Sequence, residues 1–179
     1  MKSCLKIGLF GSLIAVAGNV KAQESEYAGL DALTVAQVQA APSQVPGDVV
    51  LAAIERRISS GNHYSDNLVY PNSQIPDGKR DRMMGFASYG PFHGGHALFS
   101  CWSPGNRFTS VQPDCEGHNR SMGRPIIAFA ASVQLPGTVP LYRCYRNIPK
   151  QYDHFDSFDP NCEGVHGAVN EGVLGYFWL

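Results

Sequence analysis

An internal repeat constrains the fold of this chain more than any other feature of its sequence. The segment 101–108, CWSPGNRF, aligns with 57–64, RISSGNHY, through shared Ser, Gly and Asn residues and an aromatic residue at the end. A third copy, with a longer loop, consists of 141–145 and 153–155. The copies are 44 and 47 residues apart, counted between their marker aromatic residues Tyr64, Phe108 and Phe155. Such a period predicts a repeat architecture in which no unit buries its own apolar face.

Two further landmarks recur after the marker residues. In the second and third copies a Cys-Glu-Gly sequence begins seven residues later, at Cys115 and at Cys162. A closing aromatic residue follows the three markers by 22, 21 and 21 residues, at Phe86, Phe129 and Tyr176. We therefore divide the predicted domain, 48–179, into three units with the bounds 48–91, 92–136 and 137–179.

The composition favours short strands over helices. The chain has 19 Gly, 12 Pro and 11% aromatic residues, and 16% of its residues are charged. Each unit is predicted to run strand, turn, strand, polar loop, strand, as in 141–145, 153–157 and 172–179 of the third unit. In the first unit the run 49–58 fits either a strand or a helix capped by Asp48, and both stay open. We predict an all-β domain with pseudo-threefold symmetry, and we favour a β-trefoil over a β-prism or a three-bladed propeller.

Residues 1–22 have the features of a secretory signal peptide. Lys2 and Lys6 precede a short apolar stretch, and Ala22 is the small residue expected before the cleavage point. Residues 23–47 contain Gln, Ala and Ser with two prolines and are predicted to form a linker or a loose N-terminal arm. We therefore expect a secreted or periplasmic protein that has no membrane span.

The charge balance argues against one class of partner. Residues 23–179 carry 11 basic and 15 acidic side chains, which gives a net charge of −4. A nucleic-acid binder is expected to show a basic patch, so we predict no nucleic-acid partner. We expect a monomer whose partner is a glycan or an extracellular protein.

Four cysteines follow the predicted leader, and an even number in an exported chain predicts two disulfides. They are Cys101 and Cys115 in the second unit, and Cys144 and Cys162 in the third. The first unit has lost both together, because Arg57 and Pro71 stand in the matching places. Joint loss fits pairing within a unit and also allows pairing between the two later units, and we favour pairing within a unit. Each bridge is expected to contribute roughly 2–4 kcal/mol.

The third unit resembles a repeat found in exported bacterial proteins, with the pattern Tyr-Arg-x-Tyr, His-Phe, Glu-Gly and a closing Gly-Tyr. The matching residues are 142–145 (YRCY), 154–155 (HF), 171–172 (EG) and 175–176 (GY), with Cys-Glu-Gly at 162–164. The second unit departs from the pattern at Arg107 and at Arg124-Pro125. Members of this family often occur as modules attached to secreted hydrolases, and the family has no assigned chemistry. The resemblance implies export and a repeat fold.

Polar residues next to aromatic rings at repeat positions are our candidates for ligand binding. Threefold lectins use one such pocket in each unit, where a ring stacks on a sugar and a charged group binds hydroxyls. The candidates are His63, Arg107, Asp153, His154, Trp102 and Tyr145. The alternative is that aromatic residues at repeat positions form the core, so the polar members are the better candidates.

Two patterns could suggest metal binding, and we interpret both as structural. His93 and His96 form a His-x-x-His pair, but two glycines separate them and no third ligand is evident. An acidic cluster consists of Asp153, Asp156, Asp159, Asn161 and Glu163, and its spacing matches no known calcium loop. We expect a surface loop and turn-capping side chains, and we predict no metal and no cofactor.

The most consistent function is a secreted, non-enzymatic module that binds a carbohydrate or a cell-surface glycan. One alternative is an inhibitor or interaction protein that acts on a secreted enzyme through the loop 93–96 or 112–123. Another is a secreted hydrolase that uses His118 or His166 as a base. We do not favour an enzyme, because the cysteines are expected to be oxidised and no nucleophile elbow occurs.

Overall fold

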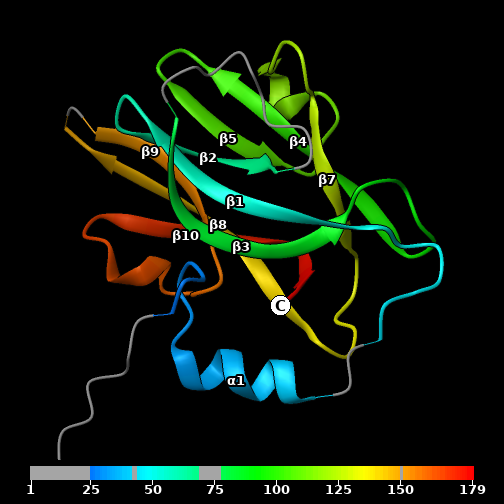
Figure 1. The fold of residues 1–179 in the computed structure, drawn as a ribbon. Coiled ribbons are helices and arrows are strands. Elements are labelled where there is room, and N and C mark those ends of the chain that lie inside the picture. Colours follow the sequence, from blue (N-terminus) through cyan, green and yellow to red (C-terminus); the bar gives the residue numbers. More distant parts are fainter. Residues whose placement is uncertain (1–24, 42–43, 69–77, 150) are drawn as a thin grey trace, which may run out of the picture.

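The computed structural model describes residues 25–41, 44–68, 78–149 and 151–179. Within these ranges the chain is mostly β and antiparallel, with one α-helix, α1 (Ala32–Ala40) (Figure 1). The strands are β1 (Leu51–Ser59), β2 (Asn62–Asn67), β3 (Lys79–Ser88), β4 (Gly95–Ser103), β5 (Asn106–Ser110), β6 (Asn119–Arg120), β7 (Ile126–Ala131), β8 (Thr138–Ile148), β9 (Gln151–Ser157) and β10 (Ala168–Trp178). The predicted leader, residues 1–22, lies outside the described residues. No helix in the described ranges has the length and apolar character needed to cross a membrane.

The strands group in the same way within 48–91, 92–136 and 137–179, which we call the first, second and third segments. The first strand of each segment lies between its second and its last strand, so β1 pairs with β2 and β3, β4 with β5 and β7, and β8 with β9 and β10. Tight turns join the first two strands at Ser60-Gly61 and at Pro104-Gly105. Gly61 and Gly105 have φ of +82° and +78°, a backbone that favours glycine, which explains the Gly shared by the two aligned sequences.

The last strands of the three segments meet one another. Their contacts are the bridges Trp178↔Phe86, Ser88↔Phe129 and Tyr176↔Ala131. Each bridge joins the closing aromatic residue of one segment to the residue two places beyond the closing aromatic residue of another. The sheet does not close on itself. The structure therefore establishes an antiparallel β protein with two disulfides, while the pseudo-threefold symmetry and the β-trefoil stay predictions.

Residues 51–58 form part of β1, which decides between the two structures that the sequence left open. The strand pairs on both sides, with β2 and with β3. Ala52, Ile54 and Arg56 are buried, so this strand carries both an apolar and a charged side chain into the interior. Strand pairing satisfies its backbone groups and overrides the helical spacing of Val50, Ile54 and Ile58.

The segment expected to be a linker or loose arm is packed against the β domain in its described part. The amide of Ala28 donates to the carbonyl of Met83, and the amide of Met83 donates to the carbonyl of Glu26. The amide of Phe158 donates to the carbonyl of Ala28. Tyr27, Ala28 and Val35 are buried in the main apolar core. Asp31 caps α1 by accepting from the amide of Thr34 at 2.8 Å. The packing of this segment was not predicted, because the segment is ordered by the apolar core that it covers and not by a helix periodicity in its sequence.

The two disulfides pair cysteines within a segment, as we favoured. Cys101 bonds Cys115 and Cys144 bonds Cys162, with Cα–Cα distances of 5.6 and 5.7 Å. All four cysteines are buried, each pair beside the marker aromatic residue of its own segment, Phe108 or Phe155. Each bridge fixes a Cys-Glu-Gly turn, η1 (Cys115–Gly117) or η2 (Cys162–Gly164), against the first strand of its segment.

Replacing Tyr27 by Ala is expected to destabilise the protein by roughly 2–4 kcal/mol, because a buried ring would be removed from the core. Urea unfolding followed by tryptophan fluorescence measures this loss. Leu33→Ala is the control, since Leu33 lies on α1 and is 69% exposed, and it should change stability by no more than about 0.5 kcal/mol. Equal effects of the two substitutions would show that the segment does not pack as described.

Candidate functional site

The second strands of the three segments, β2, β5 and β9, pack together around a buried carboxyl group. Ser65, Thr109 and Asp156 each follow the marker aromatic residue of their segment. The carboxyl group of Asp156 accepts hydrogen bonds from the hydroxyls of Ser65 and Thr109, the second at 2.6 Å. Burial raises the pKa of Asp156 above its ordinary value of 3.8, although the two hydroxyl donors oppose the shift. One side chain thus ties all three segments at this point.

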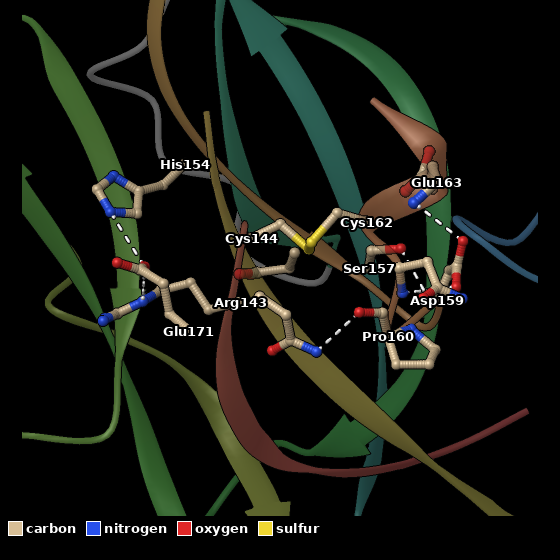
Figure 2. Close-up of a disulfide and its surroundings, with 12 residues drawn as sticks. Arg143, Cys144, His154, Ser157, Asp159, Pro160, Cys162, Glu163 and Glu171 are labelled. Carbon is tan, nitrogen blue, oxygen red and sulfur yellow. Dashed lines mark hydrogen bonds and ion pairs between the residues drawn. A yellow bond between two sulfur atoms is a disulfide. The ribbon is translucent and has the colours of Figure 1, made fainter. Parts of the chain in front are cut away.

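Arg143 of β8 joins the third segment to the second. Its Nη1 and Nη2 atoms bind the two carboxylate oxygens of Glu116 at 2.6 and 3.1 Å, and Nη1 also donates to the carbonyl of Thr109 at 3.1 Å. Its Nε atom binds Glu171 of β10 at 2.8 Å. Figure 2 shows Arg143 and His154 both reaching Glu171. The bidentate pairing of Arg143 with Glu116 is the strong form of a charge-assisted hydrogen bond.

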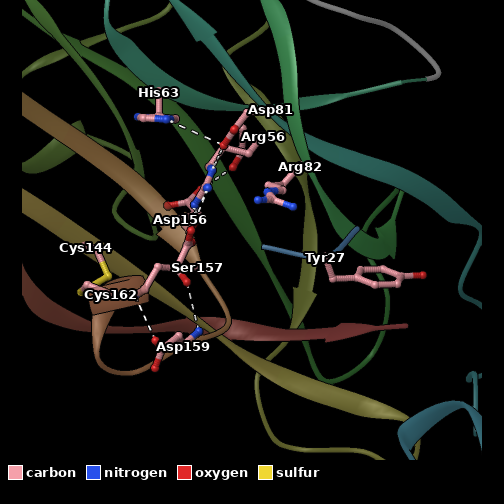
Figure 3. A network of polar contacts seen from close by, with 12 residues as sticks. Tyr27, Arg56, His63, Asp81, Arg82, Cys144, Asp156, Ser157, Asp159 and Cys162 are labelled. Atoms are coloured by element: carbon pink, nitrogen blue, oxygen red, sulfur yellow. Dashed lines mark hydrogen bonds and ion pairs between the residues drawn. A yellow bond between two sulfur atoms is a disulfide. The ribbon is translucent and has the colours of Figure 1, made fainter. Parts of the chain in front are cut away.

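Arg56 of β1 repeats this arrangement between the first and the third segments. Its Nη1 and Nη2 atoms bind Glu163 at 2.5 and 3.1 Å. Its Nε atom binds Asp81 at 2.6 Å, and Nη1 donates to the carbonyl of Asp156 at 2.8 Å (Figure 3). Burial acts to lower the pKa of Arg56 and of Arg143, but their carboxylate partners outweigh it and raise both values. Both guanidinium groups are therefore charged and held between segments.

The Cys-Glu-Gly turns have an unusual backbone that presents their glutamates to these arginines. Cys115 and Glu116 have φ of +53° and +56°, and Cys162 and Glu163 have φ of +55° and +57°. Left-handed backbone costs about 1–2 kcal/mol for each such residue. The disulfide anchors the cysteine and the neighbouring segment's arginine holds the glutamate, so the two restraints together stabilise the turn.

The contact between the first and second segments is built differently. Ser100 stands where Arg56 and Arg143 stand in the other segments, and the first segment has no Cys-Glu-Gly. Arg107 takes over one function of the missing arginine, because its guanidinium lies 5.5 Å from the ring centre of Tyr64. Arg56 and Arg143 lie at the same distance over Phe155 and Phe108. The first segment thus lacks the Cys-Glu-Gly turn, and the second segment lacks the arginine that would have bound the glutamate of that turn.

Two histidines at matching positions also form hydrogen bonds with side chains of another segment. The amide and Nδ1 of His63 contact the carboxylate of Asp153 at 2.8 and 2.6 Å. Nδ1 of His154 lies 2.8 Å from the amide nitrogen of Asn106, whose oxygen accepts from the backbone of His154 at 3.2 Å. The side-chain amide donates, so the hydrogen-bond network assigns an acceptor Nδ1 and a protonated Nε2 to the neutral His154 ring. This Nε2 faces Glu171 at 3.3 Å.

A cleft of about 700 Å³ opens where the hairpins β1–β2, β4–β5 and β8–β9 converge. Inside it the rings of Tyr145 and His154 stack, with centres 4.3 Å apart and planes 21° apart. The lining is largely polar and charged. It comprises Ser60, Gly61, Asn62, Ser103, Pro104, Gly105, Asn106, Phe108, Glu116, His118, Arg143, Tyr145, Arg146, Tyr152, His154 and Glu171. We take this cleft as the candidate functional site.

The structure brings only some of the predicted binding residues into the cleft. Tyr145 and His154 lie in it, whereas Trp102 is 42% exposed outside its lining. His63 and Asp153 line a second cleft of about 190 Å³ beside Arg56. Arg107 lies over Tyr64 and belongs to neither lining.

The charged residues of the cleft lining were not among the predicted binding residues; they are Glu116, Arg143, Arg146 and Glu171. A signal for them existed, since Cys-Glu-Gly recurs and Arg143 and Glu171 fall in the Tyr-Arg-x-Tyr and Glu-Gly patterns. We attributed that recurrence to turns and disulfides alone. The contact between Arg143 and Glu116 is evident only in the folded structure, where their segments lie side by side.

Two residues of the cleft lining each have a buried polar atom without a hydrogen-bond partner among the described residues. They are Oδ1 of Asn62 and Nε of Arg146. Both residues line the cleft. Buried polar atoms are paired in the great majority of cases, so these two are exceptions in the described part of the chain.

The patterns considered for metal binding have structural contacts. His96 lies with Nδ1 2.9 Å from the Ser132 hydroxyl and Nε2 2.7 Å from the carbonyl of Leu174. Asp159 accepts from the amides of Asn161 and Glu163 and so shapes the turn before η2. The ranges that the structure describes hold no group of three or more His, Cys, Asp or Glu residues suited to a metal ion.

No protein-family model matches this chain, and neither a curated protein nor a solved structure is significantly similar to it. The geometry of the cleft is therefore the basis for assigning a function.

Asp156→Asn is expected to gain stability relative to the unchanged protein as the pH rises from 4 to 7. The folded pKa of Asp156 is raised, so its contribution is complete below the ordinary value of 3.8 and is lost as the pH passes through the folded value. Asparagine stays neutral throughout. Urea midpoints of both proteins at the two pH values measure the difference, and a difference that is constant with pH would contradict the assignment.

A double-mutant cycle with Arg143→Ala and Glu116→Ala should give a coupling energy of about 1 kcal/mol at pH 7. The two side chains are 13% and 32% exposed, so solvent screens part of the attraction. The hydrogen bonds from Arg143 hold the pKa of Glu116 below its ordinary 4.5, so the coupling should disappear as the pH falls through that lowered value. Urea unfolding at pH 7 and in acid measures it.

The matched control for that cycle is the pair Arg56 and Glu163, which has the same geometry. Arg56 is 5% exposed, so its coupling should be larger than that of Arg143 and Glu116 at pH 7. The reverse order would contradict the roles assigned to the two pairs.

Proposed function

We propose that this chain is an exported, non-enzymatic module that binds a carbohydrate or a cell-surface glycan in the 700 Å³ cleft. The observation that carries the proposal is the stacked pair Tyr145 and His154 within a lining rich in charged and hydrogen-bonding groups. Sugars combine apolar ring faces with many hydroxyls, and such a lining can contact both. Tyr152 adds a second, exposed ring at the cleft.

The state of the two cleft carboxylates favours binding over hydrolysis. Glycosidases need one carboxyl group that stays protonated as the general acid. The pKa of Glu116 is lowered by its hydrogen bonds from Arg143, against the effect of burial. Burial acts to raise the pKa of Glu171, but His154 and Arg143 outweigh it and the pKa is lowered. Both groups are therefore suited to accept hydrogen bonds from hydroxyls and unsuited to donate a proton.

The proposal includes three structural repeats related by pseudo-threefold symmetry. Its support is the recurrence of the same contacts at matching positions: arginine to glutamate, arginine to marker ring, and the bridges between the closing strands. The resemblance of the third unit to the repeat of exported bacterial proteins, and the two disulfides, support export.

Tyr145→Ala is expected to weaken glycan binding roughly tenfold, because a stacked ring contributes on the order of 0.5–1.5 kcal/mol beyond the area that it buries. Binding is measured with a glycan array and then by calorimetry on the strongest ligand. Trp102→Ala is the control, since Trp102 holds the matching position in the second segment but lies outside the cleft. It should leave binding unchanged.

The proposal fails if the folded protein binds no glycan on the array, or if Trp102→Ala weakens binding as much as Tyr145→Ala does. An inhibitor of a secreted enzyme would instead be found in a pull-down and would lose its partner when loop 93–96 or 112–123 is deleted. A hydrolase would release sugar from a glycan that binds in the cleft and would lose that activity in His118→Ala, because His118 lies in the lining.

A further inference from the structure

The hairpin β8–β9 is longer than the two hairpins that match it. In the first and second segments strand pairing ends at Ser59 and at Ser103, and the chain turns there. In the third segment two further residue pairs follow the matching residue, Arg146. Two residues of a strand span about 7 Å. The third hairpin therefore extends past the position at which the other two turn.

The added part of the hairpin carries an exposed aromatic residue, Tyr152, that lines the cleft. The matching positions in the shorter hairpins hold the turn glycines Gly61 and Gly105. Tyr152 is 55% exposed, so its ring gains little from burial within the chain. Packing of the β domain therefore does not account for a large aromatic side chain at this position.

Tyr152 lies next to the stacked rings of Tyr145 and His154. Side chains alternate along a strand, so Tyr152 and His154, two residues apart on β9, share one face and lie about 7 Å apart. Tyr145 is directly opposite His154 on β8, and its ring stacks on the imidazole. All three residues line the cleft. The same face of the hairpin thus offers two neighbouring aromatic surfaces, the stacked pair and the ring of Tyr152.

The smaller cleft of about 190 Å³ has the same frame as the larger one. The arginine, histidine and glutamate of the two linings match by position, and they are Arg56, His63 and Glu163 against Arg143, His154 and Glu116. The phenylalanine in the smaller lining, Phe155, is buried. Contacts between segments are therefore common to both clefts, whereas Tyr152 is particular to the larger one and is not needed for those contacts.

The two aromatic surfaces indicate the length of the ligand. A volume of about 700 Å³ lies within the range of pockets that hold drug-sized ligands and leaves room for more than one sugar ring. Near the stacked pair, the side chains of Glu116 and Glu171 are 32% and 26% exposed, so their carboxylates can accept hydrogen bonds from the hydroxyls of one ring. Tyr152 offers its ring face to the next sugar.

We propose that Tyr152 forms a second subsite, so that the cleft binds an oligosaccharide of at least two units, one at Tyr145 and His154 and the next on Tyr152. This inference rests on the proposed glycan-binding function. It adds the length of the ligand and the residue that recognises the second unit. A disaccharide should bind the unchanged protein roughly tenfold more tightly than the corresponding monosaccharide, because it stacks on one more ring.

The test uses an array printed with mono-, di- and trisaccharides of glucose, mannose, galactose, N-acetylglucosamine and galacturonic acid. Calorimetry on the series that binds best then compares the unchanged protein with two variants. Tyr152→Ala should lose the gain from monosaccharide to disaccharide and keep the affinity for the monosaccharide. Tyr152→Phe, which retains the ring, should keep the gain. Because Tyr152 is exposed, both variants should melt at the same temperature as the unchanged protein.

Asn147→Ala is the matched control. Asn147 pairs with Tyr152 in the same added part of the hairpin and is exposed, but it lies outside the lining of the cleft. Its replacement should leave the affinity for every saccharide unchanged. A loss of the gain in Asn147→Ala would show that the shape of the hairpin and not the ring of Tyr152 is responsible, and it would overturn the inference.

The inference is also overturned if the unchanged protein binds monosaccharide and disaccharide equally, or if Tyr152→Ala keeps the gain. It fails as well if Tyr152→Ala weakens the monosaccharide as much as the disaccharide, or if Tyr152→Phe loses the gain. Each of these results leaves the glycan-binding proposal standing. An array without any binding to the unchanged protein overturns both.

Discussion

The arginines that bridge neighbouring segments are the interaction on which the rest of the structure depends. Arg56 and Arg143 each bind a glutamate from another segment, a carboxylate of their own last strand and a backbone carbonyl. Removing such a partly buried cation would leave carboxylates without a counter-charge, which is far more costly than the pair is stabilising. The disulfide-anchored, left-handed turns have a clear purpose in this context, because they hold Glu116 and Glu163 where the arginines reach them.

The candidate site lies where this scheme of repeated contacts is incomplete. Two of three contacts between a histidine and an Asn or Asp side chain are made, and the third is replaced by Arg107 over Tyr64. Oδ1 of Asn62, a residue that lines the 700 Å³ cleft, is buried without a hydrogen-bond partner among the described residues. Tyr145 lines the cleft, whereas Trp102 at the matching position of the second segment lies outside its lining.

Sequence patterns predicted a good part of the fold and a smaller part of the site. The alternation of 141–145 and the shared turn glycines depend on local backbone preferences, so the strands of the third segment were predictable. The packed N-terminal segment was not, because Tyr27 and Val35 are ordered by the core that they cover and not by helix periodicity. Tyr145 and His154 were found as repeat positions, but the partners of His154 come from another strand, as Glu171 of β10 does, or from another segment, as Asn106 does.

The sequence by itself determined the strand-rich architecture and favoured the pairing of cysteines within each segment without deciding it, and the structure shows that pairing. Tertiary structure alone decided which segment contacts which, and therefore where the cleft lies. The pairs Arg143–Glu116 and Arg56–Glu163 span 27 and 107 residues of sequence. Nothing in the local sequence specifies such a partner, since its choice follows from how the strands pack in three dimensions.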